Sequence, residues 1–309
     1  MAAARKSASV LPFGKRTMQR LRLDFLRRGF RVASRVAPRG AAWGAEFLFR
    51  TPPRWERTAW ERRTLSEASF AFLPTKTGRI ATWRWGESGP VVFLVHGWGG
   101  HAGRLARFGP ALRQAGFSVV SFDAPAHGLS DGLHCSLPEF VLSLRTLAER
   151  FGSPSGVVAH SLGAVAATVA LREGLELPRA VFLAPPADCE RHSERFAHQL
   201  LSLPDDVCDA MKRRLARRYS FEWPDLSISC LAPRMTARLL VFHDRGDTKV
   251  PFKDAEAIVR AWPGAELIPT LGFGHHRILR HPDVVRRTAL FLQGRPSFLP
   301  IDRLSAAGS

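Results

Sequence analysis

The five residues Ala159-His160-Ser161-Leu162-Gly163 decide how this chain is expected to fold. Residues 156–159 predict a short buried strand, and residues 164–171 predict a helix with small side chains on its packing face. A serine between such a strand and helix lies at a sharp, strained turn. The residues two before and two after it must be small so that strand and helix can approach each other. Ala159 and Gly163 meet that requirement.

The regions on both sides of this turn alternate between predicted strands and helices. Strands are predicted at residues 69–73, 79–85, 91–95, 117–122, 156–159, 180–183, 238–242 and 265–269. Helices are predicted at residues 103–116, 137–151, 164–171, 252–262 and 282–292. This alternation is typical of an α/β fold with a mostly parallel, doubly wound sheet, here of eight strands.

The segment 186–235 interrupts this alternation. It is charged, rich in arginine and without strand signals, so we expect a helical lid inserted after the sixth strand. The chain then divides into four parts. They are a basic N-terminal extension with an amphipathic helix (1–65), a core (66–185 and 236–295), the lid (186–235) and a C-terminal tail (296–309).

The net charge of +18 is concentrated at the N-terminal end of the chain. Residues 1–84 contain 19 Lys and Arg against 5 Asp and Glu, a net charge of +14, whereas the remaining 225 residues contain 26 against 22, a net charge of +4. The basic tail at the start of this region also lacks interleaved aromatic residues that would stack on bases. We therefore expect no nucleic-acid partner.

Residues 17–36 predict a basic amphipathic helix whose ragged apolar face is formed by Met18, Leu21, Leu23, Phe25 and Val32. Three interpretations of this helix are open. It docks on the rest of its own chain, it lies on an anionic membrane surface as a peripheral contact, or it is a mobile tail. Residues 1–16 are small, polar and basic and are expected to be disordered. No apolar run approaches the roughly 20 residues that span a bilayer.

A serine becomes a nucleophile only beside a base, and the base needs a group that orients it. In a fold of this type the acid follows a strand after the serine turn, and the histidine follows the next strand. Strand 238–242 runs into a segment that contains Asp244 and Asp247, and strand 265–269 runs into Gly274-His275-His276. The chain order Ser161, Asp247, His275 is the order that such a site requires.

From about Phe70 to Gln293 the chain resembles the α/β-hydrolase superfamily, in particular its esterase, lipase and serine-aminopeptidase-like branch. Four motifs produce the resemblance, in the expected order. They are His96-Gly97-Trp98-Gly99-Gly100, Asp123-Ala124-Pro125-Ala126-His127-Gly128-Leu129-Ser130, the turn around Ser161, and the paired acid and histidine segments.

The resemblance implies an α/β-hydrolase fold and a role for each matching residue. Ser161 would be the nucleophile, His275 the general base, and Asp247 the group that orients the histidine. The backbone amides of Trp98 and Leu162 would form the oxyanion hole, where each donor is worth about 2.7–4 kcal/mol. Asp244 and Asp188 are alternatives for the acid, and His276 is an alternative for the base.

These observations predict a serine hydrolase that cleaves a carboxylic ester through an acyl-enzyme, on a small-molecule or lipid-like substrate. No metal or organic cofactor is implied. A thioesterase, amidase or acyltransferase with the same triad, and a non-catalytic hydrolase-like binding protein, are the alternatives. Four scattered cysteines, at positions 135, 189, 208 and 230, favour reduced thiols in a cytoplasmic protein. The sequence does not indicate an oligomeric state.

Overall fold

The computed structural model describes residues 13–76 and 78–296 and divides the chain into two compact units. One unit holds the described residues up to Phe49 together with Arg191–Arg218. The other unit holds Arg50–Glu190 and the described residues from Tyr219 onward. Of the segment 1–16, which was expected to be disordered, residues 1–12 lie outside the described residues and residues 13–16 are helical. Nearly all of the tail 296–309 also lies outside them.

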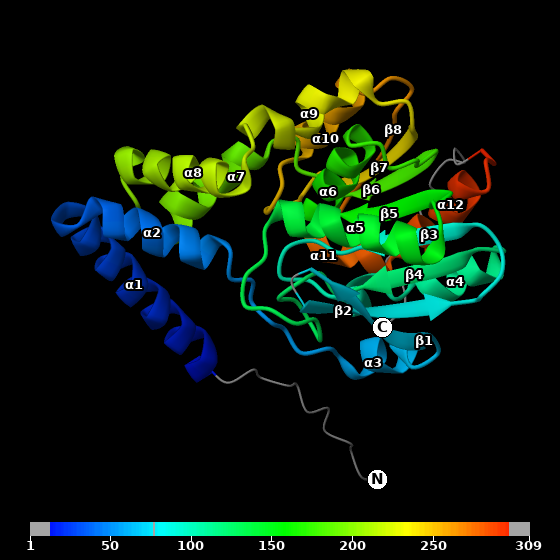
Figure 1. Ribbon diagram of the computed structural model, residues 1–309, viewed down its shortest axis with the longest axis horizontal. Helices are drawn as coiled ribbons and strands as arrows, with labels where there is room; N and C mark the ends of the chain where they lie inside the picture. The colour runs from blue at the N-terminus through cyan, green and yellow to red at the C-terminus, as the bar shows by residue number, and fades with distance from the viewer. Residues whose placement is uncertain (1–12, 77, 297–309) are drawn as a thin grey trace, which may run out of the picture. The chain divides into compact units, whose positions relative to one another are not determined.

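The larger unit is built on one sheet of eight strands in the order β1-β2-β4-β3-β5-β6-β7-β8 (Figure 1). The strands are β1 (Ser69–Thr75), β2 (Gly78–Trp85), β3 (Val91–Val95), β4 (Ser118–Phe122), β5 (Gly156–His160), β6 (Arg179–Leu183), β7 (Arg238–Asp244) and β8 (Glu266–Thr270). β2 pairs antiparallel with β1 and with β4, and the other pairs are parallel. The predicted eight-stranded, mostly parallel sheet is confirmed.

Helices pack on both faces of this sheet because successive side chains of its buried strands point to opposite sides. In β3, Phe93 belongs to the apolar core under α5 (Leu137–Phe151), α6 (Leu162–Arg172) and α10 (Phe252–Ala261). Its neighbour Leu94 belongs to the core under α4 (Phe108–Gln114) and α12 (Pro282–Leu292). The strands are therefore apolar throughout rather than alternating.

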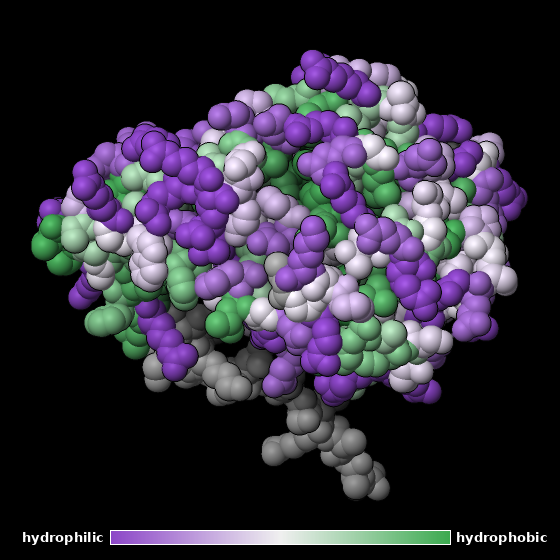
Figure 2. Space-filling model, viewed as in Figure 1, coloured by the Kyte–Doolittle hydropathy of each residue, from purple (hydrophilic) through white to green (hydrophobic). Residues whose placement is uncertain are grey.

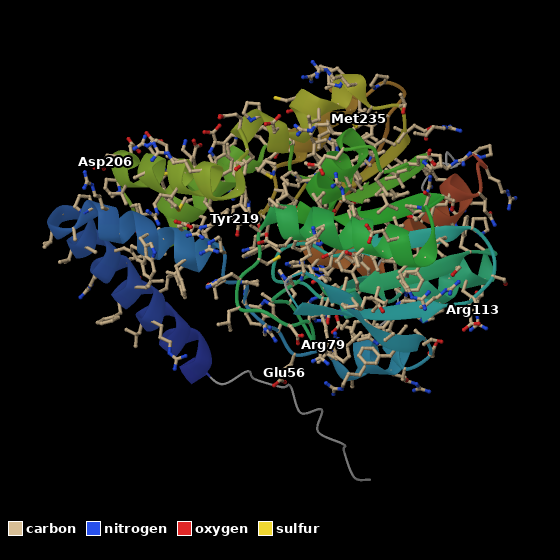
Figure 3. All side chains as sticks on the ribbon, viewed as in Figure 1. Glu56, Arg79, Arg113, Asp206, Tyr219 and Met235 are labelled. Carbon is tan, nitrogen blue, oxygen red and sulfur yellow. The ribbon has the colours of Figure 1, made fainter. Side chains whose placement is uncertain are left out.

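Between β6 and β7 the chain forms helices α7 (Cys189–Arg195), α8 (Asp205–Tyr219) and α9 (Ile228–Leu231), joined by shorter helical turns. No strand occurs between residues 184 and 237, all of which are described. α8 ends at Tyr219, and the chain reaches β7 shortly after Met235 (Figure 3). The helical character of this insertion agrees with its sequence, whereas its role as a lid and the four-part division of the chain stay predictions.

The smaller unit contains α1 (Phe13–Val36), α2 (Pro38–Phe49) and residues 191–218. Its central polar contact is Glu46 of α2, which is buried and accepts hydrogen bonds from Arg214 (2.7 Å) and Arg218 (2.5 Å) of α8. Burial by itself would raise the pKa of Glu46, but the bonds from the two guanidinium groups outweigh it and lower the pKa. A charged carboxylate therefore joins α2 to α8.

Two helices between residues 38 and 65 were not predicted from the sequence. They are α2 and α3 (Ala59–Leu65). α3 begins with a capping box, in which Thr58 Oγ1 accepts from the Glu61 amide (3.2 Å) and Glu61 Oε2 accepts from the Thr58 amide (2.8 Å). This pattern is visible in the sequence as Thr58-x-x-Glu61 and identifies the start of the helix.

The contact between α4 and β2 makes a first prediction. A Cβ at Gly109 would lie 2.6 Å from ring atoms of the fully buried Trp85, whereas nothing lies within 4 Å of a Cβ at Gly29 in α1. We expect Gly109→Ala to destabilise the protein by about 1–3 kcal/mol through overpacking. Gly29→Ala is expected to be neutral or to stabilise by up to about 1 kcal/mol through helix propensity. Thermal unfolding of both variants measures this, and equal melting temperatures would contradict the packing argument.

Candidate active site

Ser161 lies at the turn between β5 and α6 with φ 52° and ψ −121°, a strained conformation for a residue with a side chain. Its amide donates to the carbonyl of Leu183 in β6 (3.0 Å), which fixes the turn to the sheet. The Ser161 side chain makes no capping hydrogen bond to α6. The hydroxyl of Ser161 therefore does not cap helix α6.

Glycines at two positions permit the close packing around this turn. A Cβ at Gly97 would lie 2.9 Å from Cβ of Ser161, and a Cβ at Gly163 would lie 2.6 Å from the carbonyl oxygen of Val95. Both distances are shorter than real Cβ contacts. The end of β3 and the start of α6 can therefore approach Ser161 only because these two residues lack side chains.

Asp247 and His275 come from different loops and are brought together by the sheet. His275 Nδ1 donates to Asp247 Oδ2 (2.7 Å), while Asp247 Oδ1 accepts from the amides of Lys249 (2.7 Å) and Val250 (3.0 Å). Burial alone would raise the pKa of Asp247, but the bond from His275 and the two amides outweigh it and lower the pKa. An ionised carboxylate thus holds one ring nitrogen of His275 as a donor.

The alternative acids have other partners. Asp244 accepts from the amides of Gly246 (3.0 Å) and Phe273 (2.8 Å) and from the hydroxyl of Thr270 (2.9 Å), so it joins the loop after β7 to the loop after β8. Asp188 accepts from the Glu190 amide (2.9 Å) at the start of α7. Of the three candidate acids, Asp247 is the one that bonds to His275.

His160 connects the serine turn to the histidine loop, a role that the sequence did not reveal. Its Nε2 donates to the carbonyl of His275 (3.0 Å), and the two rings lie 4.7 Å apart between centroids. Burial, reinforced by the neighbouring His275, lowers the pKa of His160 well below its usual value, so the ring is neutral. No hydrogen bond joins Ser161 to His275 among the described residues. The two are instead held in one region through His160, and such catalytic bonds often form only with substrate bound.

The loop that contains Trp98 is held by two neutral histidines. His96 Nε2 accepts from the Ala124 amide (3.0 Å), and His127 Nε2 accepts from the Gly99 amide (3.1 Å). Burial lowers the pKa of each ring to about 3, so both remain able to accept a hydrogen bond at neutral pH. On the other side of Ser161, Leu162 is the first residue of α6, and its amide has no partner inside that helix.

Residues 54–57, which we call the strap, hold the loop that follows β4. Arg54 donates to four carbonyls of this loop, those of Ala126 (3.1 Å), Gly128 (3.4 Å), Ser130 (3.0 Å) and Gly132 (2.8 Å). Arg57 pairs with the buried carboxylate of Asp123 (2.5 Å), which also accepts from the amides of Ala102 and Leu129 (both 2.7 Å). No local sequence pattern indicates these bonds of the strap, because each arginine lies more than 60 residues from its acceptors.

A cavity of about 340 Å³ lies beside the candidate residues, and we call it the Trp55 pocket. It is lined by Trp55, Gly97, Trp98, Gly99, Gly100, Arg104, His160, His276 and Leu279. His160 precedes Ser161 and His276 follows His275, so the pocket adjoins both candidate residues. Trp55 belongs to the strap and is 55% exposed. No three His, Cys, Asp or Glu side chains in the described ranges are grouped so as to hold a metal.

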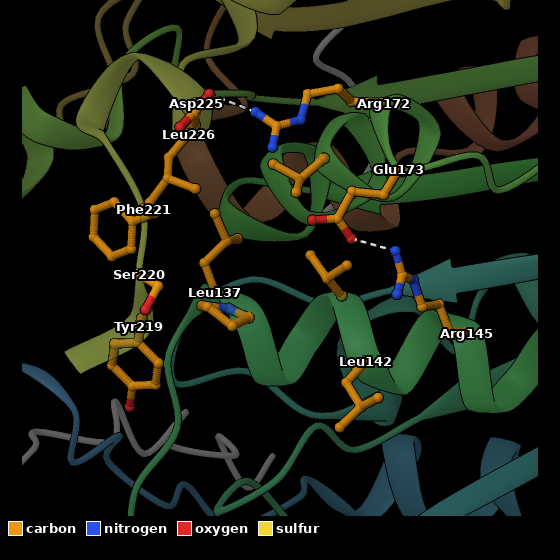
Figure 4. Close-up of a pocket in the computed structure, with 13 residues that line it drawn as sticks. Leu137, Leu142, Arg145, Arg172, Glu173, Tyr219, Ser220, Phe221, Asp225 and Leu226 are labelled. Carbon is orange, nitrogen blue, oxygen red and sulfur yellow. Dashed lines mark hydrogen bonds and ion pairs between the residues drawn. The ribbon is translucent and has the colours of Figure 1, made fainter. Parts of the chain in front are cut away.

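A second hollow, of about 200 Å³, lies between α5, α6 and residues 219–226 (Figure 4). Two ion pairs cross its rim, Arg172 with Asp225 (2.5 Å) and Arg145 with Glu173 (2.6 Å). Its lining includes none of the candidate catalytic or oxyanion-hole residues. Of these two hollows, the Trp55 pocket is the one beside the candidate site.

Comparison with known proteins identifies the family of this chain. The sequence profile of the family described as "Serine aminopeptidase, S33" matches residues 86–258, more than half of the chain. The chain belongs to this family. It is therefore a member of the α/β-hydrolase superfamily, as the four sequence motifs predicted.

One curated relative of this hydrolase is an esterase. The hydrolase is 40% identical over 79 residues to the pimeloyl-[acyl-carrier protein] methyl ester esterase of Chromobacterium violaceum, a match that covers 26% of this chain and 30% of that relative. The hydrolase thus spans less than a third of the length of this curated relative.

Solved structures share its fold at low sequence identity. An esterase of Pyrococcus furiosus superimposes with a TM-score of 0.60 at 23% identity, covering 79% of this chain and 99% of its own. Est1E from Butyrivibrio proteoclasticus, with ferulic acid bound, gives a TM-score of 0.56 at 16% identity, covering 72% and 96%. A thioesterase domain from the curacin biosynthetic pathway gives 0.54 at 15% identity, covering 73% and 99%.

The bond between the strap and the core of the hydrolase makes a second prediction. Arg57→Gln leaves the fully buried carboxylate of Asp123 without its cation, and breaking such a pair costs about 3–5 kcal/mol. Arg63→Gln changes an exposed arginine of α3 and is expected to shift stability by less than about 0.5 kcal/mol. Chemical denaturation measures both, and a similar effect of the two variants would show that the buried pair does not hold the strap.

Proposed function

We propose that this hydrolase cleaves a carboxylic ester through an acyl-enzyme, with Ser161 as nucleophile, His275 as general base and Asp247 as the orienting acid. The observation that supports it most directly is the 2.7 Å bond from His275 to Asp247 beside the strained turn at Ser161. The bond holds Nδ1 as the donor, so that Nε2 is left as the base. The esterase named among the relatives agrees with this reaction.

Each step uses groups of this chain alone. Ser161 Oγ attacks the ester carbonyl while its proton passes to Nε2 of His275, and the amides of Trp98 and Leu162 stabilise the resulting oxyanion. His275 then gives the proton to the departing alkoxide, and the alcohol leaves an acyl group on Ser161. Water, deprotonated by the same histidine, attacks this acyl group and releases the carboxylic acid. No metal or organic cofactor is needed.

A thioesterase, an amidase or an acyltransferase would use the same residues. The named relatives include a thioesterase domain as well as esterases, so the thioester is the stronger of these alternatives. We propose that the helical insertion 186–235 acts as the lid that selects among them. A binding protein without activity is the remaining candidate.

The triad makes the third prediction, which uses a fluorophosphonate probe and p-nitrophenyl esters of increasing acyl length. Wild type is expected to label and turn over, while Ser161→Ala abolishes labelling and lowers kcat about 10⁶-fold. His275→Gln is expected to lose labelling as well. Asp247→Asn is expected to lower kcat about 10⁴-fold because the histidine takes the wrong tautomer.

The matched controls change one alternative residue for the acid and the alternative residue for the base. Asp188→Asn is expected to retain labelling and turnover. His276→Gln changes the lining of the Trp55 pocket but leaves the proposed triad in place, so it is expected to retain labelling, and thermal unfolding confirms that each variant is folded. Folded wild type that neither labels nor hydrolyses an ester would favour the binding protein. Labelling with turnover of acyl thioesters alone would replace the ester by the thioester while leaving the triad in place.

We also propose that the Trp55 pocket receives part of the substrate. Trp55 and Trp98 offer two apolar walls, and Arg104 adds a cation whose partner Glu61 is shared with Arg280. The pocket thus suits an apolar or aromatic group with anionic character. Trp55 lies outside the residues 86–258 that match the family profile.

Shortening Trp55 tests this assignment. Trp55→Ala is expected to raise KM for p-nitrophenyl esters about tenfold with little change in kcat, because ground-state and transition-state binding fall together. Trp60→Ala, which changes another partly exposed tryptophan nearby in the chain, is expected to leave KM unchanged. Steady-state kinetics of both variants decides this, and an unchanged KM for Trp55→Ala would remove Trp55 from the substrate site.

A further inference from the structure

Helix α1 has two apolar faces, of which one packs inside its own unit. Leu23, Leu26 and Phe30 are partly buried. The ring of Phe30 lies against Gly44 of α2, with its outer carbon 3.6 Å from the position of a Cβ at that glycine. This face accounts for how α1 and α2 hold together as a helical pair.

The second apolar face of α1 is exposed. Leu21, Phe25, Val32 and Val36 are 60%, 80%, 61% and 80% exposed. Their spacing of four, seven and four residues places all four within about 60° of the helix circumference. We call this surface the α1 stripe. Figure 2 shows hydrophobic surface beside strongly hydrophilic surface in the region of α1 and α2. Large apolar side chains aligned in this way on a surface indicate a binding face rather than scattered exposure.

Exposed arginines flank the α1 stripe. They are Arg22, Arg28, Arg31 and Arg35 on α1, with Arg39 at the start of α2. By helical geometry Arg28 and Arg35 lie on one side of the stripe and Arg22 on the other. The described acids of the pair α1–α2 do not offset this charge, because Asp24 pairs with Arg27 (3.6 Å) and Glu46 is buried with two arginines of α8.

We propose that the α1 stripe docks on an anionic lipid surface, with its four apolar side chains at the boundary of headgroups and acyl chains and the arginines on the lipid phosphates. An apolar stripe bordered by cations is the arrangement that such a surface recognises. The same charges oppose a second copy of this chain on the stripe, because the arginines of two copies would repel each other. This docking is independent of the proposed hydrolysis.

The test is co-sedimentation of the full chain with vesicles. We expect binding to phosphatidylcholine vesicles that contain a quarter phosphatidylglycerol, weak binding to pure phosphatidylcholine, and release as salt is raised. Phe25→Ser with Val32→Ser is expected to weaken binding at least tenfold. Arg28→Gln with Arg31→Gln and Arg35→Gln is expected to remove most of the preference for the anionic lipid.

Matched controls come from exposed residues elsewhere. Leu133 is 79% exposed, so Leu133→Ser removes a comparable apolar side chain, and Arg62→Gln with Arg63→Gln removes two exposed charges; both are expected to bind like wild type. Equal loss in the control variants, or full binding by Phe25→Ser with Val32→Ser, would overturn the proposal. The proposal would also be overturned if sedimentation velocity showed that wild type is a dimer and that Phe25→Ser with Val32→Ser is a monomer. A second copy of the chain would then be the occupant of the α1 stripe.

Discussion

The close approach of three chain segments at Ser161 is the constraint on which the rest of this structure depends. The end of β3, the turn after β5 and the start of α6 meet around Gly97 and Gly163. The neighbouring atoms leave no room for a Cβ at either position. The strained φ of Ser161 persists because the hydrogen bond from its amide to β6 and the packed helix behind it permit no relaxation. Parallel strands then bring the loops after β7 and β8 to the same edge, where Asp247 and His275 meet.

Neutral histidines hold this edge together, because burying a charged imidazolium ring there would cost more free energy than burying a neutral ring. His96, His127 and His160 each bond to a backbone group of another loop, and burial lowers the pKa of all three. A neutral imidazole offers one donor and one acceptor, so a single ring can satisfy groups from two segments. The buried carboxylate of Asp123 is paired with Arg57, so the charge of Asp123 is compensated at this edge.

The sequence predicted all eight strands to within two residues at each end. Short apolar runs bounded by turn-forming residues predict buried strands from local sequence alone, without knowledge of distant contacts. It also predicted the candidate triad through chain order. It missed the strap because the partners of Arg54 and Arg57 lie more than 60 residues away. It missed α2 because that helix is stabilised by Glu46 between two arginines of α8, a contact that no local pattern encodes.

The apolar face of α1 looked ragged in the sequence because one helix has two separate stripes of apolar side chains. Leu23 belongs to the partly buried stripe with Leu26 and Phe30, whereas Leu21 and Phe25 belong to the exposed one. One periodic pattern cannot separate two faces that both contain large side chains. Packing separates them, because α2 covers one face and leaves the other beside the arginines. The sequence therefore offered membrane docking as one of three interpretations, and the structure was needed to locate the exposed face that favours it.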